Sequence, residues 1–323
     1  MLGNGESPGQ TASTSFARRR LLCLFIFLAL PLLLAAKGKN ADGPVLYREG
    51  FLKVVSPDKV SMAECRKAAA MVMDAWKFDL GVMQWAPTKE LNRPLTLRLT
   101  SADRMKKGHP GVRASSSWNG NRVTMNASLI GDRSGPLTFA HELGHIQAAR
   151  VTGKRWKSVP LYFLEGHGLI LNRLYSDRLR TSSPTDWTQN VRTVMSLSPN
   201  EARIILTDNS YSNNEKDPKK TFKMECMGVY FVEYMRTRVH GSGISDTVPK
   251  MGRVFELVGR GMSYGQAFKQ VYGVWASQVA SEIVALFERT QANPAERYKG
   301  TRFEPASQIV ANKSRKAGGA KLN

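Results

Sequence analysis

The first half of the chain contains stretches in which apolar and polar residues alternate. This alternation predicts a strand over residues 94–104, "PLTLRLTSADR". Residues 111–129 predict a hairpin that turns at Asn119-Gly120, a dipeptide favoured in two-residue type I′ turns. Residues 40–60 are expected to be extended and irregular. The pattern therefore predicts a small sheet in this half of the chain.

Apolar residues at helical spacing predict helices along most of the remaining chain. The first predicted helix spans residues 61–79. Ser61 and Glu64 can form a capping box at its start, and Gly81 is a natural stop. Further helices are expected at residues 134–152, 160–175, 198–207, 223–240, 247–260, 263–273 and 275–290.

The order of these elements, with strands early and helices alone afterwards, predicts an α+β fold. Residues 40–175 would form a first lobe that mixes a small sheet with helices. Residues 176–295 would form a helical lobe, with a cleft between the two. Residues 296–323 are basic and are expected to be a disordered tail.

The N-terminus has the pattern of a targeting segment. Three arginines at residues 18–20 precede an uncharged apolar run, residues 21–36, and a polar segment comes after it. This arrangement is typical of a secretory signal peptide over residues 1–36, and an uncleaved N-terminal membrane anchor is the alternative. Because the arginines precede the run, both alternatives export the chain from about residue 40 onward. The protein is therefore expected to be periplasmic or secreted, or membrane-anchored with its main part outside the cytoplasm.

The charge of the chain is strongly positive. Its 323 residues include 47 Lys and Arg against 26 Asp and Glu, a net charge of +21. Such a charge attracts anionic surfaces, so an anionic membrane or cell-envelope surface is an expected partner. The basic residues are spread along the chain and form no run interleaved with aromatic residues. No specific nucleic-acid partner is therefore expected.

The three cysteines, Cys23, Cys65 and Cys226, contain no C-x-x-C pair. This excludes a disulfide-dense scaffold and a cysteine zinc finger. In an oxidising compartment Cys65 and Cys226 can form one disulfide, and two buried free thiols are the alternative.

Residues 137–145, "LTFAHELGH", contain the H-E-x-x-H pattern on a predicted helix. His141 and His145 are four residues apart, which places both imidazoles on one helix face, within reach of one metal ion. Glu142 is turned about 100° away, so it is placed to act as a general base toward water. The alternative is two histidines on an ordinary helix. The chain has only five histidines, so the pair uses two of a scarce set.

A catalytic zinc site needs a third protein ligand and one open position. Glu165, in "YFLEGHG", comes after His145 with nineteen residues between them. A helix, a turn and a second helix fit that separation, and the second helix can return past the first to point Glu165 at the metal. His167 would then face elsewhere.

The segments "TFAHELGHIQAA" and "LYFLEGHGL" resemble the gluzincin zinc metallopeptidases, and residues 60–290 resemble the bacterial peptidase MA-like group. This resemblance implies a zincin-like catalytic lobe at residues 40–175 and one Zn²⁺ held by His141, His145 and Glu165. It also implies that Glu142 activates water to hydrolyse a peptide or protein substrate. The strand near residues 122–126 would pair with the extended substrate.

The chain departs from the family at several positions. Leu169 stands where thermolysin-like enzymes have an aspartate that orients a histidine, so Asn172 or a backbone carbonyl would have to replace it. Near residue 225, where an oxyanion-stabilising tyrosine is expected, the sequence reads "KMECM". A catalytically weak or inactive relative that binds peptide or anionic polymer is therefore the alternative. No exopeptidase motif is present, which favours an endopeptidase. The candidates for the missing tyrosine are Tyr211, Tyr230 and His240, with a core role favoured for Tyr230.

Overall fold

The computed structural model describes residues 42–108, 113–117, 119–181, 184–207, 217–240, 244–304 and 307. The helices and strands of the described residues all lie within the compact unit Val45–Asn323. The predicted signal peptide or anchor, residues 1–36, lies outside the described residues. Within the described ranges, no helix has the length and apolar character needed to span a membrane.

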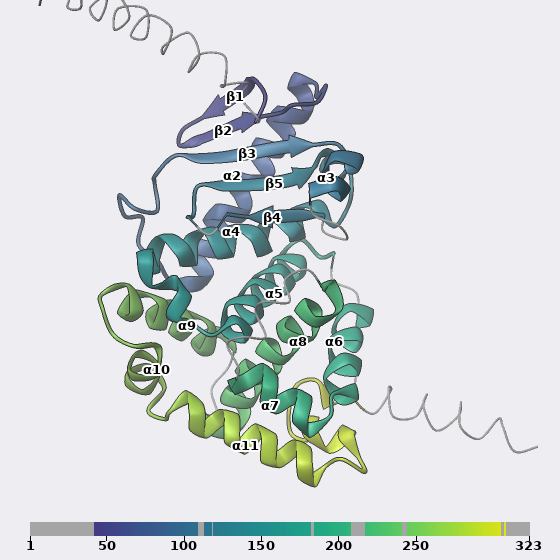
Figure 1. The fold of residues 1–323 in the computed structure, drawn as a ribbon, viewed down its shortest axis with the longest axis vertical. Coiled ribbons are helices and arrows are strands. Elements are labelled where there is room, and N and C mark those ends of the chain that lie inside the picture. Colours follow the sequence, from purple (N-terminus) through teal and green to yellow (C-terminus); the bar gives the residue numbers. More distant parts are fainter. Residues whose placement is uncertain are drawn as a thin grey trace, which may run out of the picture. The chain divides into compact units, whose positions relative to one another are not determined.

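The strands of the described residues form one mixed sheet (Figure 1) with the order β1-β2-β3-β5-β4. β1 and β2 are antiparallel, β2, β3 and β5 run parallel, and β4 lies antiparallel to β5 at the edge. Their bounds are Val45–Glu49 for β1, Leu52–Val55 for β2, Leu95–Thr100 for β3, Ala114–Ser116 for β4 and Arg122–Asn126 for β5.

The first strands correct the expectation of irregular structure over residues 40–60. β1 and β2 form a hairpin closed at Gly50, whose φ of 54° a glycine adopts without strain. The strand predicted over 94–104 ends earlier, at Thr100, and helix α3, Ala102–Gly108, comes next. The predicted β4–β5 hairpin is present. Its connection is longer than the two-residue turn, because the Ser117 amide already donates to the Arg122 carbonyl.

Helix α2, Met62–Met83, begins as predicted with the Ser61–Glu64 capping box. It runs past Gly81 and ends at Gln84 in the left-handed conformation. Tertiary packing extends the helix, because Met83 is buried in the core. Gly81 therefore fails as a stop signal.

The predicted helices of the second half are all present, and together with the sheet they confirm the α+β class. Helix α6 was not predicted from the sequence, because most of its residues are polar and its few apolar residues at helical spacing give only a weak pattern. The bounds are Gly135–Thr152 for α4, Leu161–Arg178 for α5, Pro184–Ser196 for α6, Pro199–Thr207 for α7, Pro218–Tyr234 for α8, Ile244–Gly259 for α9, Tyr264–Tyr272 for α10 and Ala276–Arg289 for α11, with short helical turns at Ala127–Ile130, Gly153–Ser158, Met235–His240 and Pro294–Tyr298.

The predicted disordered tail begins too early. Pro294–Tyr298 forms a 3₁₀ helix, and the side chains of Arg297, Tyr298 and Phe303 are buried. The Arg297 guanidinium donates to the carbonyls of Val194 and Leu197, which closes the α6–α7 connection. Residues 296–304 are thus part of the fold, and residues 308–323 lie outside the described residues.

Candidate metal centre

Helices α4 and α5 pack against each other and provide the predicted ligands. α4 has Pro136 in its first turn, and Gly153, with a φ of 58°, caps its end. Its contact with α5 depends on glycine. A Cβ on Gly144 would lie 2.5 Å from the Leu171 side chain, and a Cβ on Gly168 would lie 3.0 Å from the His141 ring. The two glycines therefore let the helices approach closely enough for their side chains to meet.

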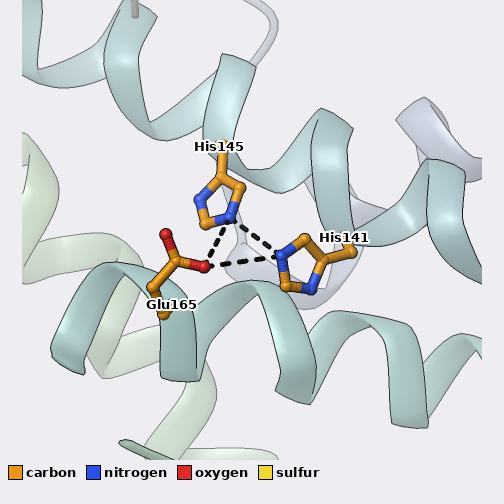
Figure 2. A group of neighbouring side chains, drawn as sticks. All are labelled: His141, His145 and Glu165. Atoms are coloured by element: carbon orange, nitrogen blue, oxygen red, sulfur yellow. Dashed lines mark hydrogen bonds and ion pairs between the residues drawn. The ribbon is translucent and has the colours of Figure 1, made fainter. Parts of the chain in front are cut away.

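The structure brings His141, His145 and Glu165 together (Figure 2). The two histidine Nε2 atoms are 3.0 Å apart. The Glu165 Oε2 atom lies 3.6 Å from His141 Nε2 and 3.3 Å from His145 Nε2. Two turns of one helix and the facing turn of the next therefore point three ligand atoms at one spot, as the spacing predicted.

The dimensions of this triangle fit a zinc ion. Tetrahedral Zn²⁺ binds nitrogen and oxygen at about 2.0–2.1 Å, which places its ligand atoms about 3.3–3.4 Å apart. The three observed separations, 3.0, 3.3 and 3.6 Å, bracket this value. Two imidazoles and one carboxylate also form a donor set typical of catalytic zinc. The residues therefore fit the ion after side-chain shifts of a few tenths of an ångström.

The electrostatics of the triangle favour a cation. Burial opposes a charge on His141, but the hydrogen bond to Glu165 and the carboxylates of Glu225 and Glu142 raise its pKa to about 9. Burial likewise opposes the charge on Glu165, but the two histidines outweigh it and hold the pKa of this carboxyl well below its usual range. Without a metal, a protonated His141 thus supplies the positive charge that a divalent cation would supply between these residues.

Glu142 is half-buried and lies one residue beyond His141 on α4. Its carboxylate is close enough to act electrostatically on both His141 and Glu225, and it is not one of the three clustered ligands.

The structure also places the other residues singled out in the sequence. His167 is buried against Trp85 and Phe255 and is not a member of the ligand cluster. Burial lowers its pKa to about 3, so it is neutral. Asn172 donates to the carbonyl of Leu137, so it is engaged there and not at a ligand histidine.

Of the candidates for the missing tyrosine, only Tyr230 has a described side chain. It is buried in the core, and its hydroxyl donates to the Arg297 carbonyl. This bears out the core role. Tyr211 lies outside the described residues, and His240 ends a π-helical turn.

The expectation that residues 122–126 pair with substrate is wrong. That segment is β5, which is hydrogen-bonded on one side to β3 and on the other to β4. The outer strand is β4, Ala114–Ser116. Cys65 and Cys226 are both free and buried, so the thiol alternative holds.

Sequence reading missed two acidic residues that interact electrostatically with this centre. Glu225 on α8 is close enough to interact electrostatically with His141, His145 and Glu165. Burial and the neighbouring carboxylates raise its pKa to about 7. Asp79 on α2 is wholly buried and interacts with His141. Neither lies near the motif in the sequence, but a lone acidic residue at an apolar face of α2 is the signal that could have pointed to Asp79.

The chain was compared with known protein families, with curated proteins and with solved structures, and none of them matches it.

Proposed function

We propose that this protein is a zinc metallopeptidase of the gluzincin type. The observation that carries the proposal is the triangle of His141 Nε2, His145 Nε2 and Glu165 Oε2, whose sides match a tetrahedral zinc site. Glu142 lies on the same helix as the two histidines, and its charge acts on His141. A bound Zn²⁺ supplies Lewis acidity, which lowers the pKa of water to near 7 and polarises a peptide carbonyl.

The residues of the chain would perform the remaining steps. His141, His145 and Glu165 hold the ion, and three protein ligands leave one position for water or substrate. Glu142 accepts the proton of the attacking water and passes it to the leaving amine as the C–N bond breaks. One residue thus acts first as base and then as acid.

An extended peptide would bind along the outer strand β4. Among the described residues, Ala114–Ser116 is paired on one side only, by β5. An unpaired strand edge offers backbone donors and acceptors to an added strand. The cleft between a first lobe and a helical lobe, and endopeptidase action, are parts of the same proposal. So is export, directed by residues 1–36 as a signal peptide or membrane anchor.

The decisive experiment is zinc analysis of the full-length protein combined with Glu142→Gln. The wild type purified without chelator should contain one zinc per chain and cleave a mixed peptide library. Glu142→Gln should retain the zinc and lose cleavage by at least about 100-fold, since a positioned base contributes 10²–10⁴-fold. Wild type without zinc, or full activity in the variant, would contradict the proposal.

A binding role at an anionic surface is the second candidate. A cavity of about 410 Å³ at the end of α4 is lined by Arg93, Lys154, Lys157 and Trp156, with no acid in its lining. Such a basic hollow suits an anionic headgroup. Salt-sensitive binding to phosphatidylglycerol vesicles, lost in the double variant Lys154→Ala and Lys157→Ala, would support it. Equal binding of the wild type to phosphatidylcholine vesicles would oppose it.

A further inference from the structure

The tip of the His141 imidazole lies against the backbone of α5 at Gly168 (Figure 2). A Cβ added to Gly168 would lie 3.0 Å from the Cε1 atom of the ring and 3.1 Å from each ring nitrogen, Nδ1 and Nε2. Carbon atoms that are not bonded to each other are normally about 3.5–4.0 Å apart. The space that a side chain at position 168 would need is therefore already filled by the edge of the ring that carries both nitrogens.

The His145 ring bounds the same imidazole from another side. The rings of His141 and His145 are arranged edge to face, with centroids 4.7 Å apart and an angle of 81° between their planes. In this arrangement His141 Nε2 lies 3.0 Å from His145 Nε2 and 3.6 Å from Glu165 Oε2. The contacts with the α5 backbone and with the His145 ring thus keep His141 Nε2 turned toward the other two candidate ligands.

A polar group would be the usual means of orienting this ring. A histidine that ligates a metal usually donates its second ring N–H to a carboxylate or a carbonyl, which fixes the orientation of the ring. Among the described residues, the hydrogen bonds and ion pairs of the His141 ring join it to the other two candidate ligands. Leu169 is apolar, and Asn172 donates to the carbonyl of Leu137. The contact at Gly168 is therefore the restraint on the ring that α5 provides.

We propose that Gly168 is a positioning residue of the metal centre, whose bare backbone orients the His141 imidazole by direct contact. This inference rests on the proposed zinc site. Because glycine has no Cβ, the backbone of α5 comes close enough to the ring tip to limit its rotation. The glycine three residues after Glu165 thus does by shape what a carboxylate usually does by hydrogen bonding.

The contact should matter most when a metal is bound. In Gly168→Ala, the new methyl group and the His141 ring must move apart by a few tenths of an ångström. A ring without a metal can yield by rotating, and alanine favours a helix over glycine, so the fold should tolerate the change. A metal site tolerates displacements of only about 0.2 Å, so the same shift should weaken zinc binding.

The test compares Gly168→Ala with Gly81→Ala in the full-length protein. Gly81 also lies inside a helix, but a Cβ there meets nothing within 4 Å. The dissociation constant of Zn²⁺ is measured by competition with a chromophoric chelator, and the thermal midpoint is measured after metal removal. Gly168→Ala should weaken zinc binding by about 10–100-fold, with a metal-free midpoint equal to or above that of the wild type. Gly81→Ala should match that midpoint behaviour and bind zinc with an affinity within about twofold of the wild type.

A loss of zinc affinity smaller than about tenfold in Gly168→Ala would overturn the inference, because the ring would then not depend on the glycine. A metal-free midpoint clearly below that of the wild type, or failure to fold, would also overturn it, since Gly168 would then serve the packing of α4 on α5.

A measurement that needs no zinc checks the contact itself. In the metal-free wild type, NMR should detect a nuclear Overhauser effect between the Gly168 Hα protons and the His141 Hε1 proton, and its absence would overturn the inference. Wild-type protein that shows this contact but binds no zinc would refute the proposed zinc site, and the inference would fail with it.

Discussion

The close contact between α5 and α8 makes a quantitative prediction that links the fold to the site. Gly228 on α8 lies against Gly166 on α5, the residue next to the candidate ligand Glu165. A Cβ added to Gly228 would lie 2.1 Å from the Tyr162 carbonyl oxygen and 2.5 Å from the Gly166 Cα. Both obstacles are backbone atoms, so no side chain can rotate away. In Gly228→Ala the two helices must separate.

The expected magnitude results from two opposing effects. Replacing a helical glycine by alanine stabilises a helix by about 0.5–1 kcal/mol. Overpacking lowers the free energy of unfolding by about 1–3 kcal/mol when side chains can adjust. A clash with backbone atoms should cost about 3 kcal/mol or more, because the backbone adjusts less easily. We therefore expect Gly228→Ala to lower the free energy of unfolding by about 2–3 kcal/mol. At about 2–4 °C per kcal/mol, the thermal midpoint should fall by roughly 4–12 °C.

The same shift should reach the metal centre. Moving α5 moves Glu165, whose Oε2 is held 3.3 Å from His145 Nε2. A metal site tolerates displacements of only about 0.2 Å, so zinc affinity should fall as well. Gly81→Ala is the matched control. That glycine also lies inside a helix, but a Cβ there meets nothing within 4 Å.

The measurement is urea unfolding of the metal-free variants, and then a zinc titration of the folded proteins. Gly81→Ala should equal or exceed the wild type in stability and bind zinc normally. If Gly228→Ala were as stable as Gly81→Ala, α5 and α8 could not be packed as closely as described, and the predicted loss of stability would be refuted.

Two further predictions concern pH and a buried arginine. The pKa of His141 is raised to about 9, so below that pH a zinc ion must displace a proton from the ring. The apparent zinc affinity should therefore rise about tenfold per pH unit from pH 6 to 8 and level off near pH 9. An affinity that stays constant over this range, measured by competition with a chelator, would refute the prediction. Arg150→Lys should lower the free energy of unfolding by about 2–4 kcal/mol, because lysine cannot serve four carbonyls and each stranded carbonyl costs about 1–3 kcal/mol. The exposed control Arg178→Lys, which pairs with Asp74, should change it by less than about 1 kcal/mol, and equal urea midpoints for the two variants would contradict the assignment.

The sequence predicted the candidate site better than its surroundings. His141 and His145 lie one helical turn apart, so the local period of the helix is enough to bring them together. Glu165 required one more step, the assumption that a second helix returns past the first, and the packing of α4 on α5 confirms it. The place of Glu142 on the same helix, one residue after His141, follows from the sequence directly.

Sequence reasoning failed where a residue's role depends on a distant segment. The pairing of residues 122–126 was misjudged, because the order of strands in a sheet is set by contacts between strands far apart in the chain. The polar helix α6 and the tail residues near Arg297 were missed for a related reason. Their few apolar or buried groups acquire a partner only when the rest of the fold is in place.

The sequence by itself determined the α+β class, the capped start of α2 and the spacing of the candidate metal ligands, because capping and helical periodicity act over only a few residues. Tertiary structure alone decided that Cys65 and Cys226 remain free, that β4 is the outer strand, and that Asp79 and Glu225 come close enough to interact electrostatically with His141. These outcomes depend on which helices and strands pack together. The packing energy is the total of many weak contacts between residues that are distant in the sequence, so it cannot be evaluated from a short segment of the chain.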